Sequence, residues 1–136
     1  MLGLSLLARL GRVWLAPMVA DTGLLPAVCY RHLVLAALVD EDFPAALGYL
    51  KWAKDPVLAQ VLVLRLRLLA EGHRRRMQTL EGLLQNGLPE ARREKCRALL
   101  AEEGRALELL VEYEARACRL LRDVKRGGEQ APSPAK

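Results

Sequence analysis

The sequence predicts an all-α fold of antiparallel helical hairpins, arranged as a solenoid or a bundle, with a long C-terminal helix. Hydrophobic residues make up 52% of the 136 residues but aromatic residues only 4%, so the core must consist mainly of Leu, Ala and Val. Apart from Val, β-branched residues are scarce, and no run of them alternates with polar residues as in a half-buried strand. Asp, Pro and Gly stand where apolar segments of helical period begin and end.

Residues 1–20 predict an amphipathic N-terminal helix, because four apolar residues recur at helical spacing before Pro17: Leu6, Leu10, Val13 and Trp14. Arg9 and Arg12 interrupt the apolar run that a secretory signal needs. The sequence therefore favours a cytoplasmic protein. An organellar presequence stays an alternative because no acidic residue precedes Asp21, and the segment from Leu2 to Leu15 also suits contact with a membrane surface.

Residues 21–126 predict a helical domain that opens with two helices joined by a tight turn. The first, residues 27–39, is apolar on nearly every side, as in a central core helix. Asp42 suits the N-cap of the second, where Pro44 loses no hydrogen bond, and Pro56 ends that helix at Asp55. Asp55 and Pro56 in turn open the next helix.

The next helical run extends from residue 57 to residue 70, with Leu58, Val61, Leu62, Leu68 and Leu69 on its core face. A break at Gly72, followed by a further helix over residues 73–84, is favoured over the alternative of one helix that continues straight through Gly72. Asn86-Gly87 predicts a firm stop, since glycine adopts the left-handed conformation after a last helical turn without strain. The longest helix then runs from Pro89 to Val124, and residues 127–136 predict a disordered tail.

The long helix carries an apolar seam at spacings of three and four: Cys96, Leu99, Glu103, Ala106, Leu110, Tyr113, Ala117, Leu120 and Val124. Glu103 is the one polar defect in this seam. Leu100, Leu107 and Leu121 widen it to a third column, which suits a bundle. We expect the helix to pack on residues 57–84 or to pair with a second copy of the chain.

Residues 30–53 resemble a tetratricopeptide repeat in the positions of their packing residues. The first-helix positions are Tyr30, Leu33, Ala37 and Leu38, and the second-helix positions are Ala46, Tyr49, Leu50 and Ala53. Pro56 comes about two residues early for that repeat, and Val34 replaces a small residue. The resemblance implies a hairpin scaffold whose concave face binds a peptide or helix of another protein.

No reaction chemistry is indicated by the sequence. The three cysteines are odd in number and far apart, which favours free thiols in a reducing compartment. His32 and His73 lack partners at the spacing of a metal or hydrolytic site, and there is no phosphate-binding loop. We therefore expect no enzymatic activity, no metal and no cofactor.

The sequence predicts a protein–protein interaction module: an adaptor, a small chaperone or an assembly subunit that binds another protein or itself. Five residues are expected to line or support its groove: Leu33, Ala37, Tyr49, Trp52 and Leu62. Tyr49 and Trp52 would otherwise simply pack between their own helices. The alternative function is a basic nucleic-acid-binding or ribonucleoprotein subunit. Its basis is that the surplus of positive charge lies in the tail and in one strip: Arg65, Arg67, Arg74, Arg75 and Arg76.

Overall fold

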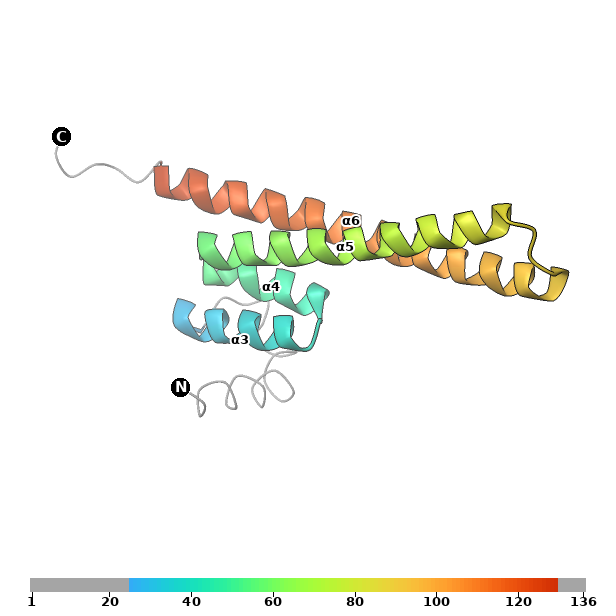
Figure 1. The fold of residues 1–136 in the computed structure, drawn as a ribbon. Coiled ribbons are helices and arrows are strands. Elements are labelled where there is room, and N and C mark those ends of the chain that lie inside the picture. The colour runs from blue at the N-terminus through green and yellow to red at the C-terminus, as the bar shows by residue number, and fades with distance from the viewer. Residues whose placement is uncertain (1–24, 130–136) are drawn as a thin grey trace, which may run out of the picture. The chain divides into compact units, whose positions relative to one another are not determined.

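The computed structural model describes residues 25–129, which form four α-helices and no strand (Figure 1). They are α3 (Ala27–Val39), α4 (Phe43–Ala53), α5 (Pro56–Gln85) and α6 (Glu90–Glu129). The predicted all-α fold with a long C-terminal helix is confirmed. The expected N-terminal helix over residues 1–20, and residues 130–136 of the expected tail, lie outside the described residues.

The described residues divide into two compact units. The first contains residues 25–63 and 116–129, and the second is Leu64–Ala115. The long helices α5 and α6 each contribute residues to both units.

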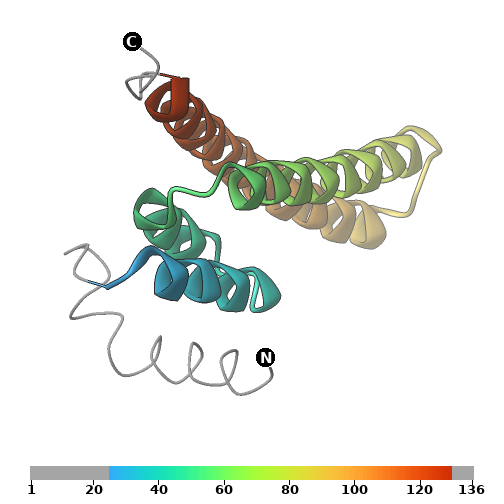
Figure 2. The same cartoon turned by 90° about the vertical axis from the view of Figure 1, so that its left-hand side faces the viewer.

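In the first unit, α3 and α4 pack against each other as an antiparallel hairpin (Figure 2). Asp42 N–H donates to Ala37 O at 2.9 Å in the turn, and Glu41 adopts a left-handed φ of 55°. The carboxylate of Asp42 accepts a hydrogen bond from Ala45 N–H at 3.2 Å, as predicted for the N-cap of α4.

A second tight connection joins α4 to α5. Lys54 ends α4 in the left-handed conformation, with φ 50° and ψ 41°, and its N–H donates to Leu50 O at 3.3 Å. Asp55 Oδ1 accepts from Val57 N–H at 2.9 Å and from Leu58 N–H at 3.3 Å, so it caps α5. The other carboxylate oxygen of Asp55 lies 3.4 Å from Arg31 Nε. This ion pair fixes α3 to the start of α5.

The core of the first unit contains mainly aliphatic and small side chains around Tyr30. Its fully buried large residues are Tyr30, Leu47, Leu50, Leu62, Val34 and Val63. Ala37, Ala46 and Ala53 are 0% exposed, and their small side chains allow the helices to approach closely. The Tyr30 and Trp52 rings lie 6.5 Å apart between centroids, at 39°, and so connect α3 with α4.

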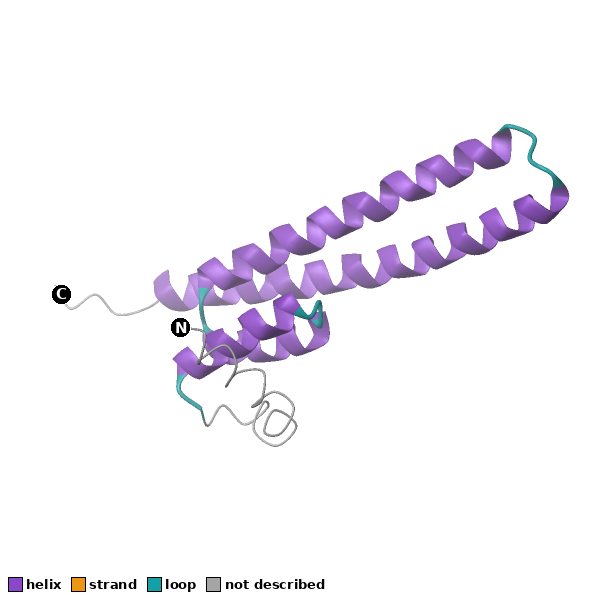
Figure 3. Cartoon of the chain, turned by 60° about the horizontal axis from the view of Figure 1, so that its bottom comes forward, coloured by secondary structure: helices purple, strands orange, loops and turns teal. Residues whose placement is uncertain are grey.

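The second unit is a helical hairpin made from residues 64–85 of α5 and residues 90–115 of α6 (Figure 3). The turn between them contains Gly87 with φ 75°, which confirms the predicted stop. Near the turn, the Cys96 thiol donates to Leu80 O at 3.3 Å. Further from it, the side chain of Met77 comes close to Gly104.

The expected break at Gly72 is wrong, because α5 continues through it to Gln85. A glycine inside a helix costs only ~1 kcal/mol relative to alanine. That cost is offset by packing on both sides of Gly72, since Leu66 and Ala70 are buried before it and the Cys96 thiol of α6 donates to Leu80 O after it. Tertiary packing therefore outweighs the local preference.

Other expected positions also need correction. Val61 and Leu68 were expected on the core face of α5 but are 43% and 70% exposed, while Leu66 is fully buried. In α6, Leu99 is 51% exposed and Leu100 is the more sheltered neighbour. The helix also reaches Glu129, so residues 127–129 are helical, although they were expected in the tail. Arg126 in the last turn favours this extension by complementing the helix dipole.

Candidate functional site

One face of α5 carries large apolar side chains that the described fold does not cover. Val57, Val61, Leu64 and Leu68 are 68%, 43%, 49% and 70% exposed. At about 100° per residue, these four positions fall within an arc of about 60°. Val57 and Val61 belong to the first unit and Leu64 and Leu68 to the second. We call the pair Leu64 and Leu68 the α5 stripe.

The buried apolar residues of α5 lie outside this arc, most of them on the opposite face: Leu58, Ala59, Leu62, Val63, Leu66 and Ala70. A helix that needed only to fold against its own chain would carry one apolar face and one polar face. This helix is apolar on two sides, and the second side is exposed. Its composition is that of a helix buried on both faces.

Within the second unit, the stripe forms part of a shallow groove of about 450 Å³, which we call the Leu64 groove. It is lined by Leu64, Arg67, Leu68, Glu71, Arg74 and Glu114. Arg67 Nε pairs with Glu114, and Arg74 Nη1 lies 3.8 Å from Glu71. The groove therefore combines an apolar floor with a charged rim, which is the usual composition of a protein–protein interface.

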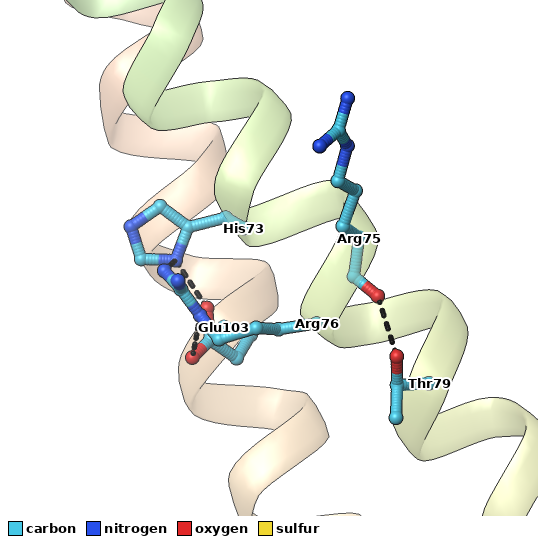
Figure 4. A network of polar contacts seen from close by, with 5 residues as sticks. All are labelled: His73, Arg75, Arg76, Thr79 and Glu103. Atoms are coloured by element: carbon cyan, nitrogen blue, oxygen red, sulfur yellow. Dashed lines mark hydrogen bonds and ion pairs between the residues drawn. The ribbon is translucent and has the colours of Figure 1, made fainter.

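A polar cluster lies on the other side of Gly72 and joins α5 to α6 (Figure 4). Glu103, the predicted defect in the α6 seam, accepts hydrogen bonds from His73 Nδ1 and from Arg76 Nε, the latter at 3.0 Å. A carboxylate can only accept, so Nδ1 must carry the hydrogen of the first bond. Arg76 Nη2, which is 3.0 Å from the same nitrogen, therefore cannot donate to it at the same time.

These contacts lower the pKa of Glu103 below its ordinary value of 4.5, first through the hydrogen bond from His73 and then through Arg76, while partial desolvation opposes the shift. The cluster holds an imidazole beside a carboxylate, but no nucleophile from residues 25–129 joins it. The nearby Thr79 hydroxyl instead donates to Arg75 O at 3.1 Å (Figure 4). We interpret the cluster as a tie between two helices.

The residues expected to line a groove in the first unit are mostly core residues. Leu33 and Tyr49 are 5% and 4% exposed, and Ala37 and Leu62 are 0% exposed. They pack between their own helices and offer no surface to a partner, so their role is to support the hairpin. Trp52 is half-buried, with Lys51 Nζ 5.0 Å from its ring centroid.

The five arginines of the expected basic strip are all exposed, but their charges are largely met within the chain. Arg67 pairs with Glu114, and Arg76 pairs with Glu103. Arg74 and Arg75 both lie near Glu71, with Arg75 Nε 3.5 Å from Glu71 Oε1. Arg65 also makes a contact in the folded chain. Ion pairs of this kind leave little concentrated positive charge for a phosphate backbone.

Neither the exposure of Leu64 and Leu68 nor the partner of Glu103 was predicted from the sequence. One signal for the stripe was present, since residues 57–69 contain more Leu and Val than one helix face can hold. Among the described residues, no three His, Cys, Asp or Glu side chains gather as a metal site requires. Within residues 25–129, no helix combines the length and hydrophobicity needed to cross a bilayer.

Comparison with family models, curated proteins and solved structures finds no match to the chain. The likeness of residues 30–53 to a tetratricopeptide repeat therefore stays a resemblance.

Proposed function

We propose that the protein is a non-enzymatic helical interaction module whose α5 stripe binds an amphipathic helix of another protein. The observation that carries this proposal is the second apolar face of α5, which leaves Leu64 and Leu68 about half or more exposed beside a groove. An amphipathic helix laid on such a surface would insert its own apolar residues at the same spacing of three and four. An adaptor, a small chaperone or an assembly subunit would use such a surface.

The charges around the stripe favour a partner with acidic flanks. Arg65, Arg67 and Arg75 lie beside or in line with the exposed leucines, whereas Glu71 is the only acidic residue of α5 in this region. Arg74 and Arg75 share the single carboxylate of Glu71, so the surface keeps a small positive excess, which is too little for a phosphate backbone but favours an acidic flank. Two copies of the chain joined through this face would bring like charges together, which disfavours self-association here.

The test is capture from a cell extract followed by measurement with the purified partner helix. The variant Leu64→Gln/Leu68→Gln removes the apolar floor, and Leu99→Gln is the matched control because Leu99 is equally exposed but lies on α6. The two stripe leucines together expose little more than one whole leucine side chain, whose burial contributes ~1.5–3 kcal/mol. Affinity should therefore fall by about 10- to 150-fold in the stripe variant and stay unchanged in the control.

Capture that the stripe variant retains in full would contradict the proposal. Two other results would also contradict it, because they would indicate nucleic-acid binding instead. In the first, nuclease treatment abolishes capture. In the second, the variant Arg74→Gln/Arg75→Gln/Arg76→Gln loses capture while the stripe variant keeps it. Because Leu64 and Leu68 are exposed, the stripe variant should fold normally, and circular dichroism checks this.

A further inference from the structure

A second hollow, of about 690 Å³, lies entirely within the first unit. It is lined by the end of α4, the start of α5 and the last turns of α6, with an apolar wall formed by Pro56, Leu120 and Val124. This volume falls within the range of small-molecule sites, which are mostly apolar with a few polar groups that orient the ligand. The wall suits the apolar body of a ligand.

Two lysines at the hollow are available to an anion. Neither Lys51 nor Lys54, both of which line it, has a carboxylate partner among the described residues, although Lys51 Nζ lies over the Trp52 ring. The acidic residue next to Lys54 is already engaged, because Asp55 caps α5 and pairs with Arg31. Asp123 is the one acidic residue that lines the hollow, so the lining keeps a net positive charge.

Lys54 stands at the end of α4, where the chain turns toward α5. Its φ of 50° and ψ of 41° are left-handed values, which glycine or asparagine adopts more easily than lysine does. A left-handed residue commonly ends a helix, as Lys54 does for α4. Here this conformation places a lysine, rather than a residue that would fit the backbone better, at the edge of an apolar hollow.

We propose that this hollow binds a small amphiphilic anion, a medium-chain alkyl carboxylate. Its chain packs against Pro56, Leu120 and Val124, and its carboxylate lies between the ammonium groups of Lys51 and Lys54. This site is separate from the α5 stripe, because none of its lining residues belongs to the stripe. The ligand combines the two features of the lining, apolar surface and unpaired positive charge.

The test is calorimetric titration of the full chain with decanoate below its micelle concentration. We expect saturable binding of one decanoate per chain and no saturable binding of decyltrimethylammonium, which has the same chain and the opposite charge. In the variant Lys51→Gln/Lys54→Asn, affinity should fall at least tenfold. Asparagine is chosen because it tolerates the left-handed backbone of position 54. Lys125→Gln removes the same charge from α6 outside the hollow and should change affinity less than twofold.

Equal affinity for decanoate in the double lysine variant, or the absence of saturable binding to the native chain, would overturn the proposal. The two lysines would then serve only to balance the carbonyl groups at the end of α4. Leu64→Gln/Leu68→Gln distinguishes this site from the proposed interface. It should bind decanoate normally, and loss of binding in that variant would place the alkyl chain on the α5 stripe and contradict the assignment.

Discussion

Glu103→Gln tests whether the polar cluster stabilises the fold, because glutamine keeps the shape of the side chain and removes its charge. Glu103 is 21% exposed and accepts hydrogen bonds from both His73 and Arg76. A hydrogen bond to a charged group contributes ~1.5–3 kcal/mol when sheltered, whereas an exposed ion pair contributes ~0–1 kcal/mol. For a partly sheltered cluster we expect a loss of about 1–2 kcal/mol at pH 7, or about 3–8 °C in melting temperature.

The pH dependence of this loss follows from the direction of the pKa shift. The pKa of Glu103 in the folded protein lies below its ordinary value of 4.5, because His73 and then Arg76 stabilise the carboxylate. The unfolded chain therefore binds the proton at higher pH than the folded chain does. The stabilisation is complete above about pH 4.5 and is lost as the pH falls through the lowered folded-state pKa.

The assay is urea unfolding followed by circular dichroism from pH 7 down to pH 3. Glu102→Gln is the matched control, because Glu102 is an exposed neighbour that makes no contact with the cluster. The stability gap between the native chain and Glu103→Gln should be largest near neutral pH and should narrow below about pH 4.5. Equal stability of the two glutamine variants at pH 7, or a gap that does not narrow in acid, would refute the reasoning.

Two further predictions concern the framework. Leu62→Ala should lower the free energy of unfolding by ~2–5 kcal/mol in the same urea assay, because Leu62 is 0% exposed. The neighbouring Val61 is 43% exposed, so Val61→Ala should lower the free energy of unfolding by well under half as much. Gly87→Ala should destabilise by ~1–2 kcal/mol because alanine resists a φ of 75°, whereas Gly82→Ala inside α5 should stabilise by up to ~1 kcal/mol. Thermal melting that ranks either pair in the opposite order would contradict these expectations.

Helix ends were predictable because their signals are local. Asp42, Asp55 and Gly87 act on backbone groups within three residues of themselves, so their effect can be inferred without tertiary structure. The bounds of α3 follow in the same way from the flanking proline and the acidic turn. Gly72 was misjudged because its local preference is weak and the packing that offsets it is tertiary.

The core face of α5 was less predictable for a different reason. Leucine or valine occupies most positions from 57 to 69, so the periodic pattern does not say which side is buried. The structure buries Leu66 and exposes Leu68. The candidate interface consists of the residues for which the pattern is ambiguous.

The polar cluster was half predictable. Glu103 stands out as the defect in the α6 seam, but its partner His73 lies 30 residues earlier in the chain. Which residue of α5 faces Glu103 depends on the pairing register of the two helices. Gly87 and the length of the turn determine that register, and no local spacing reveals it.

The contacts of the second unit are nested around the turn at Gly87, and this determines the chain-entropy cost of forming each one. Cys96 and Leu80 are 16 residues apart, Glu103 and Arg76 are 27 apart, and Glu114 and Arg67 are 47 apart. Loop-closure entropy rises with the logarithm of loop length, so the outermost pair costs only ~1 kcal/mol more to close than the innermost. Once an inner pair has formed, the next pair outward closes a much shorter free segment than its sequence separation suggests. Residues 64–115 therefore have the connectivity of a zipper that closes from the turn outward.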